Sequence, residues 1–256
     1  PALTGILLLT LSWRDILSIY AAVPIFLAFL VFWAFRDIGH SENDRSEPSH
    51  FREQMANTRD SFKEHPRLWG IMTVAGLRGM ANVAFLPFLA LYLGLDEELG
   101  LGNASLGLHI ALLVGVGVFA TPLTGYISDR FGRKLVLIPG LIGLSALTAL
   151  LIPFGEGIGL LIILACLGTF LFSDQPILTA AALDVVGEKV AASTLGVFSF
   201  SRFALAAASP LIAGQLFDAQ GIETVFLYIS GIYLVATIIL LAVPLAPPQR
   251  AAAHHH

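Results

Sequence analysis

Long apolar runs separated by short polar stretches constrain this chain more than any other feature of its sequence. A helix needs about 18 to 20 apolar residues to cross roughly 30 Å of hydrocarbon, and several runs reach that length. Hydrophobic residues make up 56% of the chain and charged residues 12%, and the mean hydropathy is +0.81. A soluble domain has about a quarter charged residues. We therefore predict an all-α polytopic membrane protein.

The runs predict seven complete membrane spans and the end of an eighth. A short polar turn at 13–15 separates the first two, and the stretch 173–176 interrupts the fifth complete run near its end. The last polar turn is expected over 218–223. The partial span is 1–12, and the complete spans are 16–35, 68–93, 105–127, 135–154, 158–183, 193–217 and 224–243.

Two further segments are not apolar enough to cross a membrane. In the long polar segment 36–67, Phe51, Met55, Thr58 and Phe62 fall on one face at helical spacing. This spacing favours an amphipathic helix on the membrane surface or, equally, a solvated linker helix. Residues 247–256 are interpreted as a C-terminal tail that ends in a purification-tag remnant.

Charges are distributed unequally between the two predicted sides of the membrane. Cytoplasmic loops are enriched in Lys and Arg, so the basic side is predicted to be cytoplasmic, together with the C-terminus, in an inner membrane. Arg14 is the one basic residue expected on the acidic side. The basic side has Arg36, Arg45, Arg52, Arg59, Lys63, Arg67, Arg130, Arg133, Lys134, Lys189 and Arg250, and the acidic side has Asp15, Asp96, Glu97, Glu98, Glu156, Asp218 and Glu223.

The polar stretch 125–134 joins two predicted spans and reads Gly-Tyr-Ile-Ser-Asp-Arg-Phe-Gly-Arg-Lys. It fits the pattern G-x-x-x-D-R-x-G-R-K at every fixed position, and in this it resembles the signature of the major facilitator superfamily of secondary transporters. The positive-inside rule explains the basic residues but not the Asp and the two Gly at these spacings. We expect a tight, charged loop formed by Gly125, Asp129, Arg130, Gly132, Arg133 and Lys134.

The resemblance implies a role for this motif in gating. Asp129 would lie against the positive N-terminal end of a helix in the opposite half of the transporter, and Arg133 would be its partner within the same half. Gly125 is expected to let the end of one helix pack closely. Gly132 is expected to supply the backbone freedom that a short reversal needs.

The resemblance also implies a helical bundle of two six-helix halves. On this reading, 1–35 is the end of the fifth helix and the sixth helix of the N-terminal half, 36–67 is the cytoplasmic interdomain loop and 68–246 is the C-terminal six-helix bundle. The stretch 1–5 aligns without gaps with 210–214, as parallel repeats would. We therefore expect the missing N-terminal half to be a partner of this chain.

Ionisable side chains inside a span are costly and mark candidate functional sites. Arg78, near the middle of its span, is the first candidate for substrate binding or coupling; alternatively, a carboxylate or backbone carbonyls hold it to fix helices together. Asp174 either carries a proton or is the permanent counter-ion of Arg78 or Arg202. Arg202, about ten residues into its span, is a further candidate for substrate binding or coupling, and Asn82 and Gln175 are weaker candidates for contacts with a solute.

His109 lies near a span end and is interpreted as a packing residue more readily than as a proton relay. The single Cys166 permits no disulfide within the chain.

These features predict a secondary active transporter of a small solute, surrounded by a lipid bilayer. The resemblance implies alternating access with a proton as the coupling ion. The surplus of buried arginine favours an organic-anion solute. The region that begins at Pro1 resembles the fifth-helix proline and glycine motif of drug–proton antiporters, which favours drug efflux. No metal-ligand cluster, G-x-S-x-G motif or paired carboxylates occur, so neither an enzyme nor a cofactor is expected. The net charge of −4 does not support a nucleic-acid partner. The alternatives are a heptahelical receptor or sensor, and a structural half that transports nothing alone.

Overall fold

The computed structural model describes residues 2–7, 10–34, 62–95, 98–186 and 191–245, and within these ranges it contains helices and no strand. Seven segments of the described chain are long and apolar enough to cross a membrane, as predicted. One of them consists of two helices, α7 and α8. The helices are α1 (Ala2–Leu7), α2 (Trp13–Ala34), α4 (Arg67–Gly94), α5 (Asn103–Phe131), α6 (Arg133–Phe154), α7 (Gly157–Leu171), α8 (Asp174–Val186), α9 (Ala191–Gln220) and α10 (Ile222–Ala242).

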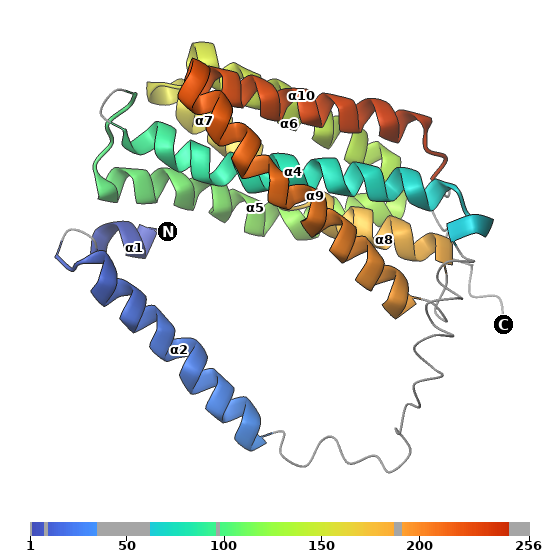
Figure 1. Ribbon diagram of the computed structural model, residues 1–256, viewed down its shortest axis with the longest axis horizontal. Coiled ribbons are helices and arrows are strands. Elements are labelled where there is room, and N and C mark those ends of the chain that lie inside the picture. The colour runs from blue at the N-terminus through green and yellow to red at the C-terminus, as the bar shows by residue number, and fades with distance from the viewer. Residues whose placement is uncertain (1, 8–9, 35–61, 96–97, 187–190, 246–256) are drawn as a thin grey trace.

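Helix α4 lies inside the bundle formed by α4 to α10 (Figure 1). It packs against α9 and α10, while α10 also packs against α6, and α7 contacts both α5 and α6. Large apolar side chains of α4, α6 and α10 form the core, among them Ile71, Phe85, Leu137, Leu144 and Phe226. Helices α5 and α9 bury a much smaller share of their residues, so most of their apolar surface is available to lipid or to other helices.

Helices α5 and α7 approach each other closely at two glycines. A Cβ at Gly168 would collide with the backbone carbonyl of Leu113, and a Cβ at Gly117 would lie 2.9 Å from the carbonyl of Gly168. Small residues allow the backbones of membrane helices to come together. These contacts fix α7 against α5 and so position the break that follows α7.

Helix α2 extends away from the bundle (Figure 1), and Ile16 is its one buried residue. It follows α1, which packs against α5. The predicted polar turn at 13–15 is wrong, because these residues form the first turn of α2. Ser12 and Asp15 cap this helix reciprocally: the Ser12 amide donates to Asp15 Oδ2 at 3.2 Å and the Asp15 amide donates to Ser12 Oγ at 3.3 Å.

The motif 125–134 is helical, and the predicted tight loop is therefore wrong. Helix α5 continues to Phe131 and α6 begins at Arg133, so Gly132 alone separates them. Its φ of 108° favours glycine because a side chain strains the backbone there. Gly221 likewise separates α9 from α10, where the sequence predicts a longer turn. Polar residues continue these helices beyond the apolar runs because the backbone hydrogen bonds stay within the helix.

Most of the predicted amphipathic helix lies outside the described residues, as do 187–190 and the tail 247–256. Phe62 is described and buried, and its ring meets that of Trp69 edge-on with 5.2 Å between centroids. The division of the chain into 1–35, 36–67 and 68–246 stays a prediction.

Candidate functional site

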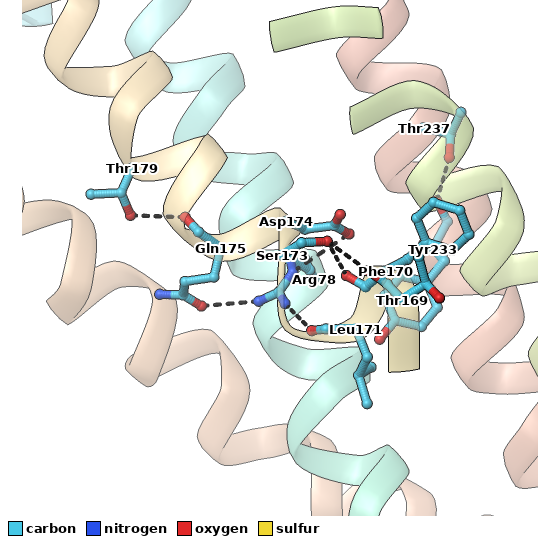
Figure 2. A network of polar contacts seen from close by, with 10 residues as sticks. All are labelled: Arg78, Thr169, Phe170, Leu171, Ser173, Asp174, Gln175, Thr179, Tyr233 and Thr237. Atoms are coloured by element: carbon cyan, nitrogen blue, oxygen red, sulfur yellow. Dashed lines mark hydrogen bonds and ion pairs between the residues drawn. The ribbon is translucent and has the colours of Figure 1, made fainter. Parts of the chain in front are cut away.

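The fifth complete span breaks at 172–173, which overlaps the stretch 173–176 where the sequence predicted an interruption, and this point lies in the middle of the span Gly157–Val186. Helix α7 ends at Leu171 and α8 begins at Asp174, so two residues lie between them. Pro176 falls in the first turn of α8, where its missing N–H has no intrahelical acceptor to lose. The break turns Asp174 and Gln175 toward α4 at the middle of the bundle (Figure 2).

Arg78 of α4 reaches across to this break. Its Nη2 donates to the carbonyl of Leu171 at 2.5 Å, and its Nη1 donates to Oε1 of Gln175 at 2.9 Å. A carbonyl in the last turn of a helix has no donor within that helix. Arg78, which is 2% exposed, therefore satisfies the free end of α7 and the start of α8. These are the contacts of an arginine that holds helices together, and its role toward a substrate stays a prediction.

Asp174 is fully buried and forms an ion pair with Arg78, with 3.8 Å between Oδ2 and Nε. Within the described residues, neither carboxylate oxygen accepts a hydrogen bond and Nε of Arg78 donates none. Of the two counter-ions that the sequence allowed, Arg78 is the one paired. Partners other than the carboxylate hold the guanidinium, whereas only the charge of Arg78 acts on the carboxylate.

Two other helices border the Asp174 carboxylate. Gly140 of α6 leaves room for it, because a Cβ at Gly140 would lie 3.0 Å from Oδ1. Tyr233 of α10 is buried nearby, and the charges of Arg78 and Asp174 both act on its hydroxyl. The carboxylate is thus surrounded by α4, α6, α8 and α10.

Arg202 and Asn82 are half-buried, and in the part of the chain that the structure describes their side chains form no hydrogen bond. The Arg202 stem crosses Gly79, where a Cβ would lie 2.8 Å from Cγ. Its guanidinium lies 4.4 Å from the centre of the Phe203 ring, a cation–π contact. Asn82 follows Arg78 by one turn on the same face of α4. Arg202 and Asn82 therefore lie near Arg78 with polar groups that no described residue hydrogen-bonds.

The motif forms a second polar cluster, at the far end of α8. Arg133 bonds through Nη1 to Oδ1 of Asp129, the partner that the resemblance implies, and lies 3.4 Å from Oγ of Ser128. Its Nε donates to Oδ2 of Asp184 at 3.1 Å. The first residue of α6 therefore joins the end of α5 to the end of α8.

The other motif residues have separate contacts. Lys134 donates to the carbonyl of Leu241 near the end of α10 at 3.1 Å, and Arg130 donates to the hydroxyl of Tyr126 within α5 at 2.8 Å. Gly125 does not form the close packing that the sequence predicts, because a Cβ there would have open space around it among the described residues.

Sequence reasoning did not identify three chemical groups that belong to these two clusters. The Leu171 carbonyl carries no residue-type signal, and Asp184 lies in a stretch that reads as a polar loop. Tyr233 left a weak signal, since a buried tyrosine hydroxyl in an apolar span needs a partner. Nδ1 of His109 lies 2.8 Å from the carbonyl of Ser105 one turn earlier in α5, and the interpretation of His109 as a packing residue stays a prediction. No group of three or more His, Cys, Asp or Glu in the described ranges is arranged to hold a metal ion.

Comparison with known proteins gives consistent matches. The sequence model of the Major Facilitator Superfamily matches residues 1–210 and 93–255. The chain is 32% identical over 170 residues to the multidrug resistance protein MdtG of Proteus mirabilis, a match that covers 64% of this chain and 41% of that protein. It is 26% identical over 167 residues to the multi-drug resistance efflux pump PmrA of Streptococcus pneumoniae, covering 64% of this chain and 41% of the pump.

Solved structures show the same fold. The peptide-transporter-family protein PepTSo superposes with a TM-score of 0.58 at 20% identity, covering 72% of this chain and 39% of PepTSo. A peptide transporter solved with sulfate gives 0.58 at 18% identity, covering 68% of this chain and 37% of the transporter. The chain spans about two fifths of the length of the curated relatives.

Proposed function

This chain belongs to the major facilitator superfamily, and on that premise we propose that it is the C-terminal portion of a proton-coupled transporter that exports drugs or organic anions by alternating access. Relatives named for multidrug resistance and multidrug efflux support drug export. Seven apolar helices and the family together make it a multi-pass membrane protein. Membership of a transporter family argues against the heptahelical receptor or sensor.

The observation that carries the proposal of proton coupling is that, among the described residues, no donor bonds the buried Asp174 carboxylate. The carboxylate is buried and unbonded, while Leu171 and Gln175 hold the guanidinium of Arg78. A proton that binds Asp174 therefore removes one charge without removing a hydrogen bond from Arg78. We assign Asp174 the role of proton carrier and Arg78 the role of its fixed counter-ion.

Arg202 supports an anionic or partly anionic solute. Its cation is half-buried and, within the described residues, contacts an aromatic ring rather than a carboxylate. Gln175 contributes a free amide donor, because only its Oε1 is engaged by Arg78. With Asn82 on the adjacent face of α4, these groups form the proposed substrate contacts.

The distribution of charge supports a cytoplasmic position for the motif and the C-terminus, in an inner membrane. Arg130, Arg133 and Lys134 lie at the helix ends beside Gly132, and Arg67 is the first residue of α4. The described helix ends on the opposite side have Glu98, Glu156, Asp218 and Glu223.

The exposed apolar surfaces of α2, α5 and α9 support an N-terminal half as partner. Phe26, Phe119 and Phe200, one from each helix, are each at least two thirds exposed. The chain alone would then be the non-transporting structural half. Vesicles that contain it with and without the N-terminal half test this: solute uptake by the chain alone contradicts the need for a partner.

Proton coupling is tested in proteoliposomes that contain the complete transporter. An imposed pH gradient is expected to drive accumulation of a labelled drug in the wild type. Asp174→Asn should abolish the response to the gradient. The matched control, Glu223→Gln, changes an exposed acid in the first turn of α10 and should leave the response intact. Accumulation that still follows the gradient in Asp174→Asn overturns the proposal.

A further inference from the structure

Three side chains around the ion pair have polar atoms that no described residue satisfies. They are Nε of Arg78, both carboxylate oxygens of Asp174 and the hydroxyl of Tyr233, from α4, α8 and α10. These residues are 2%, 0% and 1% exposed. Buried polar groups in folded proteins are normally bonded to protein or to ordered water, because an unsatisfied group is costly. Arg78 and Asp174 lie 3.8 Å apart, and the charges of both act on the Tyr233 hydroxyl, which together point to a shared partner.

We propose that Tyr233 shares a buried water molecule with Asp174 and Nε of Arg78, and that Tyr233 is thereby a positioning residue for the proton site. The inference rests on the proposed role of Asp174 in proton coupling. A buried water needs two to four polar partners, and this site offers three. The proposed ligand is thus a water molecule, bound beside the Asp174 carboxylate that receives the proton.

The donor and acceptor chemistry of the three groups is complementary. Arg78 Nε only donates, an ionised carboxylate only accepts, and a tyrosine hydroxyl does either. With Asp174 ionised, the water accepts from Nε and donates to the carboxylate and to the Tyr233 oxygen. With Asp174 protonated, the carboxyl O–H donates to the water, which still donates to Tyr233. One water therefore serves both protonation states by turning.

Two reciprocal hydrogen bonds between Ser145 and Ser230, here called the Ser145–Ser230 clasp, hold α10 one turn before Tyr233. Ser145 of α6 donates to the carbonyl of Ser230 at 2.9 Å, and Ser230 donates to the carbonyl of Ser145 at 2.8 Å. These reciprocal bonds set the register of α10 against α6. Tyr233 follows Ser230 by three residues and so lies on the same face of α10. The clasp therefore fixes where the buried Tyr233 ring enters the core.

The titratable groups that act on Tyr233 come from two of the helices around it. Arg78 of α4 and Asp174 of α8 contribute their charges. Helix α6 contributes Gly140, which has no side chain, beside the Asp174 carboxylate. The state of the water is therefore coupled to the Arg78–Asp174 pair.

Infrared difference spectroscopy of the complete transporter in nanodiscs, between two pH values, tests the proposal. Asp174→Asn identifies the carboxyl band. Tyr233→Phe keeps the ring and should move that band and abolish a water O–H band that shifts in H₂¹⁸O. The matched control is Tyr228→Phe on the same helix, whose hydroxyl lies 3.2 Å from Oγ of Ser209 and should affect neither band. A carboxyl band unchanged by Tyr233→Phe overturns the proposal.

Two further measurements separate this inference from the proposed function. In the unsubstituted protein, H₂¹⁸O should shift a water O–H band, and Asp174→Asn should remove that band. This test does not depend on the folding of Tyr233→Phe. If the unsubstituted protein shows no such band, the proposed water site is overturned. In transport, Tyr233→Phe should alter the proton-driven rate at a given pH by roughly two- to tenfold, the effect of one net hydrogen bond. Gradient-driven transport in Asp174→Asn would refute the role of Asp174 in proton coupling. The spectra would still show whether a water molecule is bound at the Arg78–Asp174 pair.

Discussion

Asp174 and Asp184 belong to the same short helix, α8, and each pairs with an arginine of a different helix. Asp174 meets Arg78 of α4 at 3.8 Å, and Asp184 meets Arg133 of α6 at 3.1 Å. Ten residues of helix separate the two aspartates by about 15 Å. Because the break after Leu171 separates α8 from α7, these two pairs position α8 and connect the buried site to the motif.

Loss of Arg78 is expected to destabilise the protein. In Arg78→Ala the Asp174 carboxylate stays buried without its cation, and the Leu171 carbonyl loses its donor. Breaking a buried ion pair by removing one partner costs about 3–5 kcal/mol. The unfolding midpoint in detergent should therefore fall markedly. The double variant Arg78→Met, Asp174→Leu replaces the pair by apolar side chains and should recover much of that loss.

Arg202→Ala is the control for the stability measurement. Its guanidinium is half-buried and contacts the Phe203 ring, so its removal should cost about 1 kcal/mol or less. A midpoint for Arg78→Ala that equals the midpoint of Arg202→Ala would show that the buried pair does not stabilise the bundle.

The Arg133 cluster is expected to restrain the motif end of the bundle. Ser128, 1% exposed beneath Arg133, is replaced by cysteine in a Cys166→Ala background. Its labelling by a water-soluble maleimide then reports opening. Asp184→Asn removes a partner of Arg133, and labelling should accelerate roughly two- to fivefold, as expected for a partly exposed ion pair worth up to about 1 kcal/mol.

Two more variants complete the labelling experiment. Asp129→Ala removes the other carboxylate from Arg133 and should act in the same direction, with the double variant fastest. Arg130→Ala is the control, because among the described residues Arg130 donates to Tyr126 within α5 and holds no second helix. Labelling that is equally slow with and without Asp184 would rule out the restraint.

The spans could be predicted because transfer of apolar side chains into lipid dominates their energetics. Helix α10 is a good example: 224–243 was expected and Ile222–Ala242 is observed. Helix α5 shows where this reasoning stops, since it continues through polar residues to Phe131. Hydropathy measures transfer into lipid and does not measure whether a polar segment keeps its helical hydrogen bonds. Only the glycine at 132 marks the true end.

The site was predictable in part for the same reason. Arg78 and Asp174 were found because a charge inside hydrocarbon is costly, whatever its partner. Their pairing depends on the break between α7 and α8, which the sequence indicates at 173–176 and the structure shows at 172–173. Tyr233 and Asp184 depend on which helices are neighbours, and a single sequence does not contain that information directly.

The Ser145–Ser230 clasp is expected to stabilise the packing of α6 on α10. Hydrogen bonds between membrane helices contribute about 0.6 kcal/mol on average and about 1.7 at most. Ser145→Ala and Ser230→Ala should each lower the unfolding free energy by an amount in this range. Because the two hydroxyl oxygens also lie 3.1 Å apart, either substitution removes this shared contact, and the double variant should lose less than the sum of the two. Full additivity in the double-mutant cycle would mean that the serines do not act as a pair.

Space beside Asp174 is expected to matter more for coupling than for stability. Gly140→Ala places a Cβ 3.0 Å from Oδ1 of Asp174, so the carboxylate must shift by a few tenths of an ångström. Gly143→Ala, on the same helix, places its Cβ 3.3 Å from the Phe170 ring instead. Both changes favour the helix by up to about 1 kcal/mol, so the two variants should have similar unfolding midpoints. Gly140→Ala alone should reduce drug accumulation driven by a pH gradient. Equal accumulation in the two variants would show that the carboxylate tolerates displacement.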